Sequence, residues 1–159
     1  MDIETKKIFQ QARKGELPED FNQWELATDR GWTVAHTAAS FSNLPGDFDQ
    51  WRLSDKNGWT VGHIAAINSK LPEGFHWWDI FNDINWSIAH IAASHGNLPA
   101  DFSQWRLADN DGWTVAHVAA SRNDLPEDFT QWEIADKKGY TVADIAVQYG
   151  HIPIKKIKK

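Results

Sequence analysis

The sequence predicts an all-α solenoid: five 27-residue helix-turn-helix units stacked in a row, with a cap at each end. Two repeating blocks support this prediction. The nine residues from Gly112, GWTVAHVAA, have counterparts that start at Gly31, Gly58, Asn85 and Gly139, each 27 residues after the last. Leu-Pro dipeptides keep the same interval, at Leu17, Leu44, Leu71, Leu98 and Leu125, and Ile152-Pro153 follows in step. Such a fixed interval is typical of arrays in which each unit buries its apolar face against its neighbours.

The chain is predicted to be one repeat domain over residues 1–159. Residues 1–16 form an N-terminal capping helix, in which Ile8, Phe9 and Ala12 share one face. Its other positions hold Lys and Gln because a terminal unit faces water on one side. Residues 17–151 hold the five units, and residues 152–159 form a basic C-terminal tail.

Each unit is predicted to contain two short helices. Thr33 and its equivalents can cap the first helix, and the preceding glycine marks a tight turn with positive φ. The second helix is expected to open at the Leu-Pro dipeptide, because proline is tolerated at the first helical position. Phe21 and Trp24 would then share one face. The same spacing recurs as Phe48 and Trp51, Phe75 and Trp78, Phe102 and Trp105, and Phe129 and Trp132.

The run from Asp109 to Ala120, DNDGWTVAHVAA, resembles the start of an ankyrin repeat, D-x-x-G-x-T-P-L-H-x-A-A. The resemblance covers about Leu17 to Gly150, and Asp144 replaces the histidine in the last unit, as in C-terminal ankyrin caps. Two features depart from the family. The interval is 27 residues against 33, and Val-Ala stands in place of Pro-Leu. The missing residues must come from the second helix and the β-hairpin that follows it, so we expect both to be short or absent. An alternative is a leucine-rich-repeat-like solenoid, because Phe102-x-x-Trp105-x-Leu107-x-x-Asn110 resembles that pattern.

A column of histidines, His36, His63, His90 and His117, is expected to be structural. Neighbouring units stack at about 8–10 Å, whereas a zinc ion needs every ligand nitrogen within about 2.1 Å. Each histidine is instead expected to bond backbone or the capping hydroxyl, as the resemblance implies. Catalysis normally needs one unrepeated constellation, so we expect no enzyme, no metal and no cofactor.

The net charge of −6 argues against nucleic-acid binding, which needs a basic surface. No apolar run is long enough to span a membrane. No signal peptide is visible at Met1, so a cytoplasmic location is expected, or that of a secreted effector. The residue after each helical Trp alternates in sign, as Glu25, Arg52, Asp79, Arg106 and Glu133, and is expected to form bridges between units.

Two surfaces are candidates for binding a protein partner. One is the third unit, where Trp77, Phe81 and Ile84, next to His76, replace polar or small residues of the other units. Three such apolar side chains would form an exposed patch, which commonly marks an interaction site and could also support a homodimer. The other is the aromatic row Trp32, Trp59, Trp86, Trp113 and Tyr140, which in ankyrin repeats often faces the partner.

The sequence therefore predicts a non-catalytic protein-binding module, of a kind common in bacteria, their phages and their secreted effectors. One alternative is an acidic inhibitor or immunity-type protein that blocks a nucleic-acid-binding site. Its acidic groups would be Glu19, Asp20, Asp47, Asp101, Glu127 and Asp128. A second alternative is glycan binding by the aromatic row.

Overall fold

The computed structural model describes residues 1–151 and consists of α-helices joined by turns and loops. Within these residues there are six helices and no strand, so the all-α prediction is confirmed. The helices are α1 (Ile3–Lys14), α2 (Val34–Ser40), α3 (Val61–Ile67), α4 (Ile88–Ser94), α5 (Val115–Arg122) and α6 (Val142–Gln148). The basic tail and the Ile152-Pro153 dipeptide lie outside the described residues.

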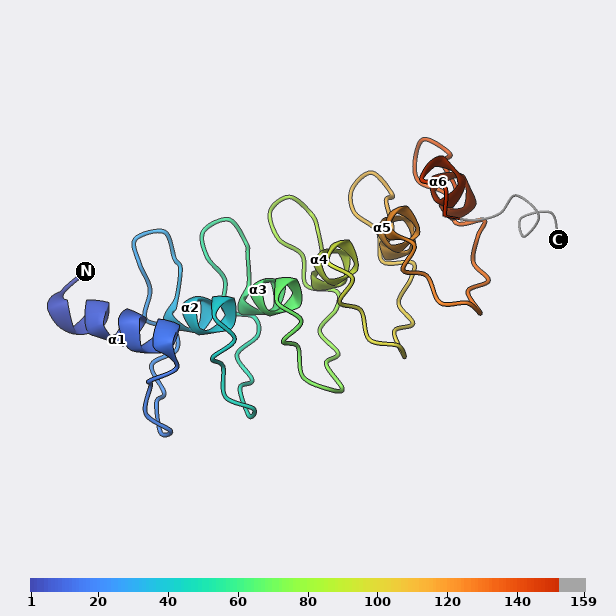
Figure 1. Ribbon diagram of the computed structural model, residues 1–159. Helices are drawn as coiled ribbons and strands as arrows, with labels where there is room; N and C mark the ends of the chain where they lie inside the picture. Colours follow the sequence, from blue (N-terminus) through green and yellow to red (C-terminus); the bar gives the residue numbers. More distant parts are fainter. Residues whose placement is uncertain (152–159) are drawn as a thin grey trace.

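The helices form a row in chain order, and each packs on the next (Figure 1). The loops that carry the Leu-Pro dipeptides project to one side of the row, which we call the turn side (Figure 1). The loops that precede each short helix project to the opposite side, called the loop side (Figure 1). Alanines such as Ala35 and Ala38 are completely buried between helices. Their small side chains let the helices approach closely.

The predicted caps and turns are confirmed. Thr33, Thr60, Ser87, Thr114 and Thr141 are the N-caps of α2 to α6, and each accepts a hydrogen bond from the third helical residue. The four predicted turn glycines, Gly31, Gly58, Gly112 and Gly139, all have positive φ, between 72° and 87°. Asn85, which replaces glycine in the third unit, also has a φ of 61°. Asparagine is among the few residues that tolerate this region.

The prediction of a second helix in each unit is wrong. The segment after each Leu-Pro consists of two successive turns, as in the bonds Phe21 N–H to Pro18 C=O and Leu26 N–H to Gln23 C=O. The reason lies in the short helix that follows. Its first two N–H groups, on Val34 and Ala35, donate to the carbonyls of Leu26 and Trp24.

The same pair of bonds recurs in all five units. The first N–H groups of a helix have no partner within it, and here the preceding turns supply those partners. A helix across the turns would use the same carbonyls for itself. In a 27-residue unit, therefore, the turns act as the N-terminal cap of the helix.

The Phe and Trp pairs still meet, although no helix carries them. The rings of Phe21, Trp24, Phe48, Trp51 and their successors form an unbroken edge-to-face series that ends at Trp132. Centroid separations are 4.9–5.6 Å and interplanar angles 79–88°. Each such contact contributes about 0.5–1.5 kcal/mol beyond its buried area. This aromatic series joins every unit to the next on the turn side.

The leucine-rich-repeat alternative does not agree with the structure, because that repeat needs a strand in every unit and residues 1–151 contain none. The expectation of a short or absent hairpin is confirmed. Each loop retains one isolated bridge, as between Ala27 and Thr33. None of the described helices has the length and apolarity needed to cross a membrane.

One joint in the row, between α4 and α5, is less well bonded than the others. A backbone bond links adjacent loops at three joints: Lys56 N–H to Arg30 C=O, Asp83 to Asn57 and Lys137 to Asp111. Within residues 1–151, the equivalent bond from Asn110 to Ile84 is not made. A Cβ atom added at Gly31, Gly58 or Gly112 would lie within 2.8–3.0 Å of a backbone nitrogen of the next loop. Asn85 has that Cβ, which accounts for the missing bond.

The same joint lacks a second contact. Asn43 donates through Nδ2 to Ala12 and Arg13 C=O, and Asn97 donates to Ala66 and Ile67 C=O, so each caps the preceding helix. At the α2–α3 joint, Asn68 provides this cap, and at the last joint His151 donates to Ser121 C=O. At the α4–α5 joint the residue at this position is Asp124, which follows α5. Its carboxylate cannot donate a hydrogen bond, and it pairs with Arg122 at 3.1 Å.

Candidate binding surfaces

The histidine column is structural, as the resemblance implies. In each of the four units the histidine Nδ1 accepts a hydrogen bond from the hydroxyl of the capping residue, at 2.7–2.8 Å. It also accepts from the backbone N–H of the same capping residue. Nε2 lies 2.9–3.1 Å from the carbonyl of the aromatic residue in the next unit, for example Trp59 for His36. A carbonyl can only accept, so the proton is on Nε2 and both nitrogens are used. Asp144 replaces the histidine in the last unit, and it keeps only the capping bonds.

All four histidines are completely buried, and this burial lowers the pKa of each, in spite of the opposing effect of the carbonyl bond. For His63 the pKa falls to about 4. The neutral ring is therefore the form that joins the units at pH 7. Within residues 1–151, no group of three or more His, Cys, Asp or Glu side chains is placed to hold a metal ion.

The aromatic row lies on the loop side, half-buried. Each tryptophan ring packs on the histidine of its own unit, with centroid distances of 4.9 Å for Trp32, 5.7 Å for Trp59, 5.8 Å for Trp86 and 5.0 Å for Trp113. Trp32 also donates from Nε1 to Thr37 Oγ1 at 3.1 Å. Tyr140, at the end of the row, is 53% exposed. The row is thus partly structural and partly available to a ligand.

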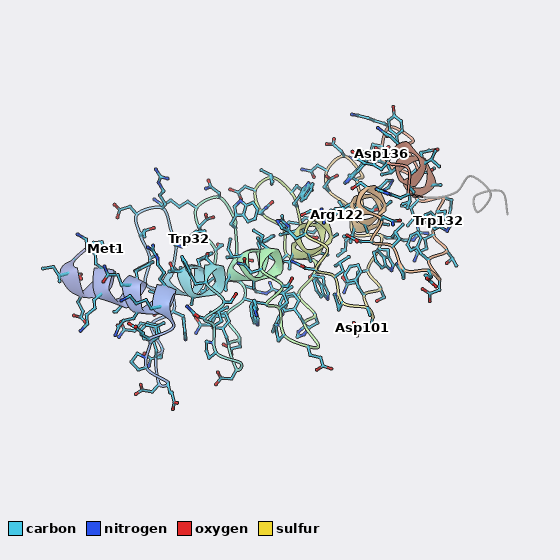
Figure 2. The ribbon with its side chains drawn as sticks, in the orientation of Figure 1. Met1, Trp32, Asp101, Arg122, Trp132 and Asp136 are labelled. Carbon is cyan, nitrogen blue, oxygen red and sulfur yellow. The ribbon has the colours of Figure 1, made fainter. Side chains whose placement is uncertain are left out.

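At its C-terminal end the row borders a groove of about 540 Å³, which we call the C-terminal groove. Its aromatic walls are Trp86, Trp113, Tyr140 and Tyr149, and Ile145 and Gln148 of α6 lie beside them. Its charged walls are Asp109, Asp111, Asp136 and Lys138. Figure 2 shows Asp136 on the loop side of the row, opposite the turn side that carries Asp101 and Trp132. Only the ring column of this groove can be predicted from the sequence, because the acids and Tyr149 reach it only through the stacking of units.

The third-unit residues are spread along their unit. Trp77 is half-buried, with its ring 3.9 Å from that of the exposed His76 and 5.7 Å from that of Phe75. Phe81 is half-buried, 6.2 Å from the His90 ring. Ile84 is 65% exposed and sits in the loop before Trp86. No described contact joins Trp77 to Ile84.

The third unit also lacks polar contacts that other units have. Asp55, Asp109 and Asp136, in the second, fourth and fifth units, each accept two backbone N–H bonds through one carboxylate oxygen, as Asp55 does from Asn57 and Trp59 at 2.9 Å. Asn82 replaces this aspartate, accepts only from Trp86, and leaves its buried Nδ2 without a partner. An unsatisfied buried amide costs about 1–3 kcal/mol. This unit therefore carries an energetic penalty that the others avoid.

The charge alternation is only partly used. Arg106 and Glu133 lie 3.5 Å apart, with both side chains more than two-thirds exposed. Among the described residues no other pair in this column forms an ion pair. An exposed pair contributes little, about 0–1 kcal/mol, so the aromatic series, the histidines and the asparagine caps join the units instead.

A further hollow lies on the turn side, between the turns of the third and fourth units. Its volume is about 760 Å³, and Phe75, Trp78 and Phe102 are among the residues that line it. Gly74 lies at its edge, where the other units have aspartate. The aspartates predicted for the inhibitor alternative, such as Asp20, Asp47 and Asp101, are exposed along this side.

No protein-family model matches the sequence, and no curated protein matches it.

Proposed function

We propose that this protein is an ankyrin-like solenoid of five 27-residue units that binds a partner protein through one face of the array and catalyses no reaction. The proposal rests on the departures of the third unit from the pattern of the other units. There, Ile84 is exposed, Asn82 leaves a buried amide unsatisfied, and Asn85 accompanies the loss of a bond between loops.

Such departures from the rules of a repeat are expected where function is selected at the expense of stability. Two further observations support a binding role. The repeated histidines have both ring nitrogens engaged in bonds between and within units, and the helices form an extended row with long loops on both sides (Figure 1). The proposed partner surface consists of Trp77, with His76 beside it, and of Phe81 and Ile84 farther along the third unit. The same residues would serve a homodimer.

The test uses a triple variant, Trp77→Gln, Phe81→Ala and Ile84→Asn. Each change installs a residue that another unit has at that position, so the fold should remain intact by circular dichroism. The wild type should capture a specific protein from its source cell, or self-associate in light scattering, and the triple variant should lose that interaction. Phe41→Asn, which removes an exposed ring from the helix C-terminal side of the row, is the matched control and should bind as the wild type does.

Binding that is equal in the triple variant and the wild type would contradict this assignment. Loss of the interaction between 50 and 200 mM salt would instead favour the acidic-inhibitor alternative, because charge-based binding is strongly salt-dependent.

A further inference from the structure

The C-terminal groove combines two kinds of surface that attract the same chemical group. Trp86, Trp113, Tyr140 and Tyr149 line it with aromatic rings, and aromatic faces attract cations. Asp109, Asp111 and Asp136 add three carboxylates against a single cation, Lys138. Rings and acids therefore both favour a positively charged occupant.

The rings are held with one face available. Trp113 stacks on His117 with a centroid distance of 5.0 Å and an interplanar angle of 29°, so one face of the indole is covered. Trp113 also lines the groove, which leaves the face turned away from His117 for a ligand. Tyr140 and Tyr149 are more than half exposed. The histidine beneath Trp113 has both nitrogens occupied and provides no competing donor.

The carboxylates are held in place by backbone. One oxygen of Asp109 accepts from Asp111 N–H and Trp113 N–H, each at 2.9 Å, and one oxygen of Asp136 accepts from Lys138 and Tyr140 in the same way. Among the described residues, the second oxygen of each makes no hydrogen bond or ion pair. These two oxygens belong to successive units, beside successive rings.

We propose that the C-terminal groove binds an extended basic segment of a protein partner, with arginine or lysine side chains seated over the aromatic rings beside Asp109 and Asp136. The proposal rests on the proposed function, in that the array is a binding module, but it concerns other residues than Trp77, Phe81 and Ile84. Successive units of packed helices lie about 8–10 Å apart. An extended chain advances about 9–10 Å in three residues. The matching ligand therefore carries a basic residue at every third position.

Arginine is the preferred cation, because its planar guanidinium both stacks on aromatic rings and bonds a carboxylate through two N–H groups. A sugar would also stack on the rings and donate hydroxyl hydrogen bonds to the carboxylates, but a neutral sugar leaves the excess negative charge of the groove uncompensated, whereas a cation neutralises it. Charge thus separates the two occupants experimentally.

The experiment measures binding of fluorescent peptides by anisotropy at 150 mM salt, near physiological ionic strength. One peptide has arginine at every third position with serine between, and a second has glutamine in place of each arginine. The protein variant Asp111→Lys with Tyr140→Ala changes two exposed side chains that make no described side-chain hydrogen bond. The matched control is Asp101→Lys, the same change of charge on the turn side (Figure 2).

The wild type should bind the arginine peptide at least tenfold more tightly than the glutamine peptide. The double variant should lose at least tenfold of that affinity, and Asp101→Lys should stay within twofold of the wild type. Equal binding of both peptides, equal loss in the two protein variants, or binding of a neutral oligosaccharide in preference to the arginine peptide would overturn the inference. If the peptides do not bind as expected but the triple variant of the third unit still loses partner capture, the groove proposal fails and the proposed function holds. If the peptides bind as expected but the triple variant captures the partner as the wild type does, the groove proposal holds and the assignment of the third-unit residues fails.

Discussion

Replacing Asp124 with asparagine should stabilise the protein, because it supplies the cap that the α4–α5 joint lacks. At the equivalent position Asn43 and Asn97 each donate to two carbonyls at the end of the preceding helix, at 2.8–3.1 Å. An asparagine side chain introduced here would donate to the carbonyls of Ala93 and Ser94, which lie as far back in the chain as the acceptors of Asn43 and Asn97 do.

The expected gain follows from the bonds made and broken. Two new hydrogen bonds contribute about 0.5–1.5 kcal/mol each. The half-exposed ion pair between Arg122 and Asp124, which is lost, contributes about 0–1 kcal/mol. The net increase in the free energy of unfolding is therefore about 1 kcal/mol. With a urea dependence of about 1–3 kcal/mol per molar, the unfolding midpoint should rise by about 0.3–1 M.

The assay is urea unfolding at pH 7, followed by tryptophan fluorescence, for the wild type, Asp124→Asn and the reverse change Asn97→Asp. Asn97→Asp removes both donors from the α3–α4 joint, while its carboxylate can still accept from Ser69 Oγ as Asn97 does. It should lower the unfolding free energy by about 1–3 kcal/mol. If neither change moves the midpoint, the asparagine caps do not hold the units together and the account of this weak joint is wrong.

Two further predictions concern contacts between units. Asn85→Gly should restore the bond from Asn110 N–H to Ile84 C=O, so hydrogen exchange of the Asn110 amide should slow severalfold while that of Lys56, whose bond is already made, stays the same; an unchanged rate at Asn110 would show that the Asn85 Cβ is not what prevents the bond. Burial in the folded protein lowers the pKa of His63 to about 4, whereas its pKa in the unfolded chain is about 6.5. The stability that the neutral ring provides is therefore complete above a pH of about 6.5. It is lost as the pH falls toward 4, by up to about 1.4 kcal/mol per pH unit. His63→Gln keeps a side chain that can serve the capping box, so urea unfolding between pH 7 and pH 4.5 should show a lower stability at pH 7 and a shallower pH dependence than the wild type; an equal slope would contradict the role of this buried ring.

Much of the fold could be predicted from the sequence because local rules apply to it. A threonine just before a helical run is well suited to cap the helix, and a glycine shortly before that threonine is well suited to a turn with positive φ. The structure has both features at the predicted positions. The histidine column was also predicted to bond backbone or hydroxyl. In the structure each ring bonds both, and the carbonyl it reaches belongs to the next unit.

The second helix could not be excluded in this way, because proline, acids and aromatic spacing suit a helix start and a turn equally well. A contact between two segments excludes the helix. The carbonyls of Trp24 and Leu26 accept hydrogen bonds from the first N–H groups of α2, so they cannot accept bonds within a helix across the turns. The candidate surfaces also depend on contacts that the sequence does not reveal. The aromatic row was visible as a column, but its burial on the histidines and its meeting with Asp109, Asp136 and Tyr149 depend on contacts between units.

The 27-residue period, the capped short helices and the unit that departs from the pattern can be recognised from local residues alone, because they depend on groups close together in the chain. The groups that join one unit to the next cannot be recognised in this way. Those contacts form between residues 23 to 31 positions apart, where the stacking of one unit on another sets which donor meets which acceptor. The weak joint between α4 and α5 and the acidic aromatic groove near α6 both arise from that stacking.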